Sequence, residues 1–123
     1  MRWTGNRTNV LHLPVRGNGD GGAYTTVGDL HLFWRALLAG RIVQPALVAE
    51  LVRPRSDVPE EGMRYAAGLW LHAIGPQLIM AGYDAGVTAR SVHDPASDTT
   101  VTVLSNSSRG AGAVVEVVQG CFD

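Results

Sequence analysis

The sequence of 123 residues contains no lysine, and all ten of its basic residues are arginines. Serine-hydrolase chemistry that depends on a Ser-x-x-Lys pair is therefore excluded for this chain by itself. Cysteine is almost as scarce, because Cys121 is the only one. A single cysteine can form no internal disulfide and cannot build a thiol metal cluster. Cys121 could react if it is exposed, but nothing near it in the sequence is placed to activate it.

The chain also lacks an excess of charge of one sign. Its formal net charge is −1, and its arginines are scattered from Arg2 to Arg109. This distribution offers no basic stripe for nucleic acid and no polybasic segment for anionic lipid. No apolar run is long enough to span a bilayer, and the amino terminus has no signal-peptide core. We therefore expect no nucleic-acid or membrane partner; the cytoplasm is compatible with this composition, which leaves the location open.

A first helix is predicted after residue 26. Thr26 is a suitable N-cap, and Asp29 follows at the capping-box distance. Gly40 supplies a C-terminal stop. Between these signals apolar residues repeat at helical spacing and predict a face turned to the core: Leu30, Phe33, Trp34, Leu37 and Leu38.

Two residues of this helix lie off the apolar stripe. His31 and Arg35 are therefore expected to face solvent. A second helix is predicted from Pro45, a good first-turn residue, to Arg53, and Pro54 ends it.

The second half of the chain has the pattern of a sheet. A polar surface loop is predicted at Pro54–Gly62, and turns are predicted at Gly75–Pro76 and Asp94–Asp98. Strands are predicted at Tyr65–Ala73, Leu78–Tyr83, Val87–His93 and Thr99–Leu104. Their short connections imply an antiparallel meander.

A closing helix is predicted with Ala111, Val114, Val115 and Val118 on one face. The predicted fold class is therefore α+β: two helices, an antiparallel sheet of about four strands, and a C-terminal helix laid on one face. We expect one domain over residues 1–123.

Four segments, in this order, resemble a known family. Gly19–Leu30 looks like a Gly-Gly-x-x-Ser/Thr-Thr-x-x-Asp-Leu signature, and Ala36–Gly40 is an ALLAG run. Tyr65–Trp70 is similar to a YGLGW strand, and Asp94–Asn106 is similar to a DP…VVVLSN close. Together they resemble the carboxy-terminal half of the serine β-lactamase and penicillin-binding-protein-like family, over nearly the whole chain. The resemblance implies a parent that acylates a serine with an ester, amide or lactam and then hydrolyses the intermediate.

Two elements of that family are missing from the sequence. The family's serine and lysine lie on a helix of the amino-terminal half, and a Tyr-x-Asn or Ser-x-Asn element follows it. Neither Tyr24 nor Tyr83 is followed two residues later by Asn, and no Ser precedes a Lys. The resemblance therefore assigns no catalytic residue to this chain.

The family's third element is Lys-Thr-Gly or His-x-Gly on the edge strand beside the nucleophile, where a cation binds the substrate carboxylate. A backbone N–H of that strand helps to form the oxyanion hole. Counting back from Gly86 places Met80, which is neither charged nor a proton donor, in the cationic position. Gly82 keeps the close backbone approach, and Asp84 either contacts substrate or, as we favour, shapes the turn. The implied substrate-binding residues are Met80, Ala81, Gly82, Tyr83 and Asp84.

Other candidate sites are weaker. The four histidines lie in different predicted elements without a metal-ligand spacing, so solvated or structural roles are favoured over metal binding. The loop Gly17–Gly22 has no preceding apolar strand and no Gly-Lys-Ser/Thr ending, so a turn is favoured over phosphate binding. We expect no cofactor.

Three hypotheses follow. The first is the C-terminal part of a β-lactamase-like serine hydrolase, inactive alone, whose parent takes a small ester, amide or lactam. Its exposed apolar surface would pair with the missing N-terminal half or with a second copy, as in a dimer. The second is a non-catalytic binding or interaction domain that keeps the cleft, which Met80 supports. The third is an unrelated small α+β protein.

Overall fold

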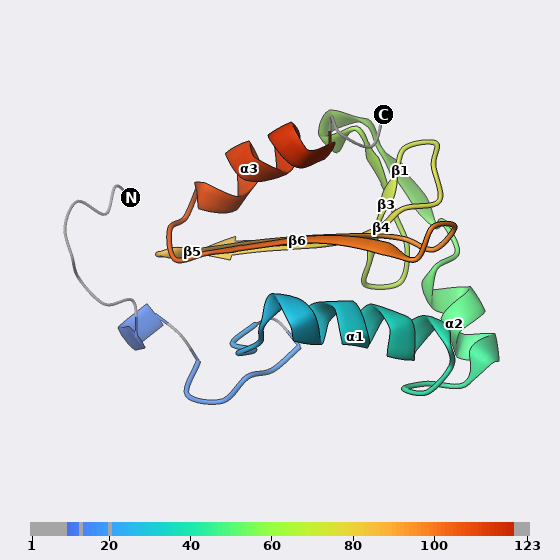
Figure 1. The fold of residues 1–123 in the computed structure, drawn as a ribbon, viewed down its shortest axis with the longest axis horizontal. Helices are drawn as coiled ribbons and strands as arrows, with labels where there is room; N and C mark the ends of the chain where they lie inside the picture. The colour runs from blue at the N-terminus through green and yellow to red at the C-terminus, as the bar shows by residue number, and fades with distance from the viewer. Residues whose placement is uncertain (1–9, 13, 20, 120–123) are drawn as a thin grey trace.

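A computed structural model describes residues 10–12, 14–19 and 21–119 of the chain. Six antiparallel strands form one sheet, with helices on both of its faces (Figure 1). The α+β class is confirmed, and the sheet has six strands where about four were expected. In the described part of the chain, no helix is both long and apolar enough to cross a membrane.

The sheet is a meander in which every strand pairs with the next along the chain. Short connections explain this order, because antiparallel neighbours can be joined by tight turns. The strands are β1 (Ser56–Val58), β2 (Met63–Tyr65), β3 (Trp70–His72), β4 (Leu78–Asp84), β5 (Val87–Asp94) and β6 (Thr99–Ser105).

The two additional strands come from the region before residue 73. The predicted loop Pro54–Gly62 contains β1 and a 3-10 helix, η2 (Pro59–Glu61), so its description as a loop was wrong in part. The predicted strand Tyr65–Ala73 is in fact divided between β2 and β3. Ala66 donates its N–H to the Leu69 carbonyl at 2.8 Å across a tight turn. Strands of three residues are too short to show an alternating pattern in the sequence.

Helix α1 (Val27–Leu38) begins where the sequence predicts. The Thr26 hydroxyl accepts a hydrogen bond from the Asp29 N–H at 3.1 Å and donates one to the Asp29 carboxylate at 2.9 Å. These contacts satisfy an N–H group that would otherwise have no partner in the first turn. The helix ends at Leu38 with Ala39 as its C-cap, and the chain turns away at Gly40, whose φ of +70° suits glycine.

The remaining helices are shorter. Helix α2 (Pro45–Leu51) starts at the predicted proline and ends two residues before the predicted Arg53. Helix α3 (Gly110–Gln119) covers β5 and β6 on the face opposite α1 (Figure 1). A one-turn 3-10 helix, η1 (Val10–His12), precedes the predicted glycine-rich loop.

The core forms where α1 crosses the sheet. Trp34 is completely buried, and the side chains packed with it are also buried: Leu37, Ala66, Leu69, Leu71 and Leu78. On the other face, α3 buries Ala111 and Val115, whereas Val114 is about half exposed. The apolar stripe predicted for α1 therefore faces the core, and the stripe predicted for α3 does so in part.

Candidate functional site

The five substrate-binding candidates occupy the outer part of β4. Strand β4 pairs with β5 along its whole length. Strand β3 is shorter and pairs only with Leu78 and Ile79 of β4. From Met80 to Asp84, no strand in the described part of the chain pairs with the side of β4 that faces away from β5. We call this side the open edge of β4, and it brings all five candidates together.

The side chains along the open edge alternate between the two faces of the sheet. Met80 lies opposite Ser91, whose hydroxyl contacts Trp34 of α1, so Met80 belongs to the α1 face. Its side chain is half-buried and packs against the core cluster. Ala81 and Tyr83 point to the opposite face, where Tyr83 is 83% exposed. Met80, which the resemblance predicts for the family's cationic position, thus contributes to packing.

The backbone of the open edge offers unpaired donors. His72 of β3 donates its N–H to the Gln77 carbonyl at 3.0 Å. Hydrogen-bonded and non-hydrogen-bonded pairs alternate along an antiparallel ladder, so every second residue of β4 turns its N–H and C=O toward the β3 side. Beyond Ile79 these residues are Ala81 and Tyr83. Their N–H groups, about 7 Å apart along the strand, point away from β5 to the open edge.

The open edge ends in a turn that is held by side chains. The Asp84 carboxylate accepts a hydrogen bond from the Ala85 N–H at 2.6 Å, which is a turn-shaping contact. The Ser108 hydroxyl accepts from the Gly86 N–H at 2.8 Å and donates to the Asp84 carbonyl at 3.0 Å. Sequence reasoning missed Ser108; its only signal was the polar run that follows β6. A contact between Asp84 and a ligand stays a prediction.

A buried polar cluster between α1 and the sheet was also missed. His31 and His93 both place Nδ1 on the Thr100 hydroxyl, at 2.8 Å and 2.9 Å. One hydroxyl proton can serve only one of these nitrogen atoms, so the other Nδ1 carries a proton and donates. The expectation that His31 faces solvent was wrong, because Thr100 lies over the side of α1 next to the apolar stripe. Arg35 is exposed and pairs with Asp98 at 3.3 Å.

Tryptophan and serine form the second part of this cluster. The Trp34 indole N–H donates to the Ser91 hydroxyl at 2.9 Å, and Ser91 shares a 2.8 Å hydrogen bond with Thr102. The His93 ring stacks on Trp34 with a centroid distance of 5.7 Å. Burial lowers the pKa of His93, while Asp98 and Asp94 oppose this shift in part. The cluster joins α1 to β5 and β6, and β5 in turn pairs with β4, which has the open edge.

Metal binding by the histidines and reactivity of Cys121 are the two further candidates that the sequence raises. Within residues 10–12, 14–19 and 21–119, no group of three or more His, Cys, Asp or Glu side chains could hold a metal ion. Cys121 lies outside the described residues.

A solved structure resembles nearly the whole chain. It is the crystal structure of a penicillin-binding protein from Bacillus halodurans, which matches with a TM-score of 0.83 and 32% sequence identity. The chain has a penicillin-binding-protein-like fold. The match covers 94% of this chain and 36% of that protein's chain, so the sequence spans about a third of its length. No family model matches the sequence, and no curated protein matches it.

The penicillin-binding-protein-like fold agrees with the resemblance drawn from the sequence motifs. It does not assign a role to any residue, and the five candidates on β4 stay predictions. The geometry adds that they lie on one continuous backbone edge with two donors directed outward. A strand edge of this kind can receive an extended ligand by backbone pairing.

Proposed function

We propose that this chain supplies the substrate-binding strand of a β-lactamase-like serine hydrolase. The observation that carries the proposal is the open edge of β4 within a penicillin-binding-protein-like fold. The serine and its base would come from residues outside this sequence, in the same polypeptide or in a partner, because no Ser-x-x-Lys is present. The chain alone would then bind substrate without turning it over.

In this proposal the N–H groups of Ala81 and Tyr83 are the hydrogen-bond donors by which the strand binds the substrate. A substrate with an extended ester or amide segment would lie along the open edge and accept these donors. A donor fixed by the sheet costs no reorganisation when charge develops on a carbonyl oxygen during acyl transfer. Gly82 lies between the two donors without a side chain, and nothing lies within 4 Å of where a Cβ would stand.

A second candidate function is a binding domain without catalysis. It is favoured by Met80, which packs against the core cluster and brings no charge to the open edge. The two functions differ in what accompanies the chain: a Ser-x-x-Lys encoded upstream in the same gene favours the hydrolase, and a gene without one favours the binding domain.

Ligand binding at the open edge can be tested by amide chemical shifts. We would titrate the ¹⁵N-labelled chain with N-acetyl-alanyl-alanine methyl ester. The amides of Ala81 and Tyr83 should shift more than those of Met80 and Gly82, which face β5. Uniform shifts along β4, or none, would contradict binding at the open edge.

A proline scan provides the matched control. Ala81→Pro removes an outward N–H and leaves the pairing with β5 intact, so the variant should fold and bind more weakly. Gly82→Pro removes an N–H that faces β5 and should destabilise the hairpin instead.

Intact-protein mass after incubation with a fluorescent penicillin or an activated ester should show no adduct. A stoichiometric adduct would require a nucleophile within this chain and would overturn the proposed division of roles.

A further inference from the structure

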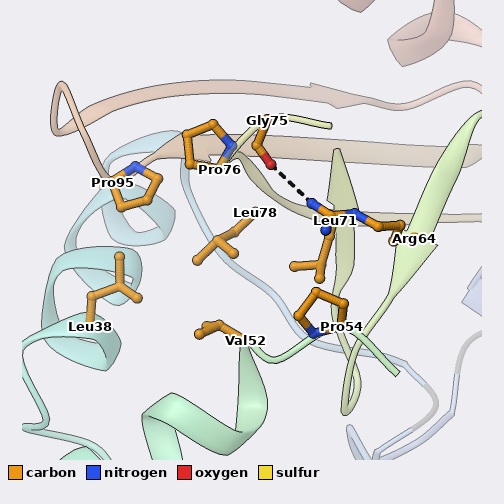
Figure 2. A pocket seen from close by; sticks show the side chains of 9 residues that line it. All are labelled: Leu38, Val52, Pro54, Arg64, Leu71, Gly75, Pro76, Leu78 and Pro95. Carbon is orange, nitrogen blue, oxygen red and sulfur yellow. Dashed lines mark hydrogen bonds between the residues drawn. The ribbon is translucent and has the colours of Figure 1, made fainter. Parts of the chain in front are cut away.

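A pocket at the other end of β4 lies apart from the open edge. Its volume is about 320 Å³, and it lies between α1, the end of α2 and the first residues of β4 (Figure 2). Leu78 lines it, while Asp84 ends the open edge six residues later. At about 3.3 Å per residue, the outward donors Ala81 and Tyr83 lie about 10 and 17 Å from Leu78 along the strand, and no residue of the open edge lines the pocket, so this is a second site. The lining residues are Leu38, Val52, Pro54, Arg64, Leu71, Gly75, Pro76, Leu78 and Pro95.

The walls of the pocket are apolar and preformed. Leu71 and Leu78 are 3% and 4% exposed and belong to the core cluster, so the floor of the pocket is fixed. Pro54, Pro76 and Pro95 form much of its rim in Figure 2. Proline rings have a fixed φ and no N–H, so the rim is stiff and offers no backbone donors at these positions. Such a pocket can bind an apolar group at little ordering cost.

Arg64 is the one charged residue in this lining. Its Nη2 donates to the Gly75 carbonyl at 3.1 Å (Figure 2). Its Nε donates to the His72 carbonyl at 3.0 Å. These two carbonyls fix the guanidinium but do not neutralise it. Arg64 is half-buried, and no acidic side chain of the described residues forms an ion pair with it. Asp57, its cross-strand neighbour, is exposed and lies beyond ion-pair distance.

The guanidinium of Arg64 can therefore still donate hydrogen bonds to a ligand. A guanidinium carries five N–H groups in a planar fork, and Arg64 uses two of them on the carbonyls. A partly desolvated cation without a counter-ion is energetically unfavourable, so an anion at this position would be stabilising. Apolar walls with one cation fit a ligand that has an apolar body and a single negative charge.

We propose that this pocket binds a small free carboxylic acid. The carboxylate lies against the guanidinium of Arg64, and the apolar chain lies over Leu71 and Leu78. The pocket is at the lower end of the size range for small-molecule sites, which restricts the ligand to a short chain or a single ring. The proposal is independent of the function proposed for the open edge.

The test uses three probes of equal chain length on the ¹⁵N-labelled chain: hexanoate, hexanol and hexylamine. Hexanoate should shift the amides of Leu71, Gly75 and Leu78 saturably, and should bind at least about tenfold more tightly than hexanol, since a charge-assisted hydrogen bond contributes that much or more. Hexylamine should bind most weakly. Equal binding of the three probes, or no saturable shift with hexanoate, would overturn the proposal.

Two variants complete the test. Arg64→Gln should weaken hexanoate about tenfold or more and leave hexanol unchanged. Val52→Phe fills the pocket without touching Arg64 and should abolish the binding of both probes. It decides the question if Arg64→Gln fails to fold. Unchanged hexanoate affinity in either folded variant would refute the assignment.

Discussion

Replacing Ser91 by alanine would leave a buried donor without its acceptor. Trp34 is 0% exposed and Ser91 is 2% exposed, so no solvent can replace the 2.9 Å hydrogen bond from the indole N–H. An unsatisfied buried donor costs about 1–3 kcal/mol. The side chain of Ser91 is small, so little packing is lost with it. We expect Ser91→Ala to lower the free energy of unfolding by about 2 kcal/mol.

The assay is urea unfolding followed by the fluorescence and circular dichroism of each variant. The matched control is Ser97→Ala, because the exposed Ser97 hydroxyl donates only to the Asp94 carboxylate at 3.0 Å. A surface change of this kind should stay within about 0.5 kcal/mol. For a chain of this size, the loss in Ser91→Ala corresponds to a decrease in Tm of several degrees.

A double-mutant cycle isolates the hydrogen bond. Trp34→Phe removes the indole N–H together with some packing, so it destabilises the protein by itself. In the Trp34→Phe background, Ser91→Ala leaves no indole N–H unsatisfied. The costs of the two single changes should therefore sum to about 1–2 kcal/mol more than the loss measured for the double variant. Strict additivity of Ser91→Ala and Trp34→Phe would refute the hydrogen bond as the source of the stability.

Three further outcomes are expected. Because burial lowers the pKa of His93, the unfolded chain takes up this proton first; stability should be complete above about pH 6.5 and fall as the pH decreases through the folded pKa. Urea titrations at several pH values should show this slope, and His93→Asn should reduce it; an unchanged slope would contradict it. Thr26→Ala should cost about 1 kcal/mol through loss of the α1 cap, measured by thermal unfolding; no change would mean that the cap contributes nothing. Leu32 and Leu47 are 59% and 55% exposed, so sedimentation velocity should show self-association that Leu32→Gln reduces; a monomer at all concentrations would refute this.

The sequence by itself determined the elements whose signals are local. Thr26 and Gly40 mark the ends of α1 because capping and a left-handed φ depend on a few neighbouring residues. The long strands β4, β5 and β6 were predicted within a residue or two, because each has several residues with strand propensity and a turn on both sides. The motif order also pointed to the fold that the solved relative shares.

The short strands and the contacts between distant residues could be identified only from the tertiary structure. Strands β1 and β2 have three residues each; β1 pairs with β2, and β2 pairs with both β1 and β3, which no local pattern records. Ser108 contacts the turn after Asp84 from 24 residues away, and such a separation leaves no periodic signal. The side of β4 that stays open was likewise decided by the short length of β3.

The polar cluster under α1 shows the same limit most clearly. From its position on the helix, His31 was expected in solvent, yet it meets Thr100, 69 residues later. Helical periodicity tells which residues share a face, but not which strand residues lie against that face. In the same way, the pocket at Arg64 is assembled from residues of α1, the segment that follows α2, three strands and the turns between strands. The sequence determined which residues carry chemistry, and the packing of the helices on the sheet decided which of them meet.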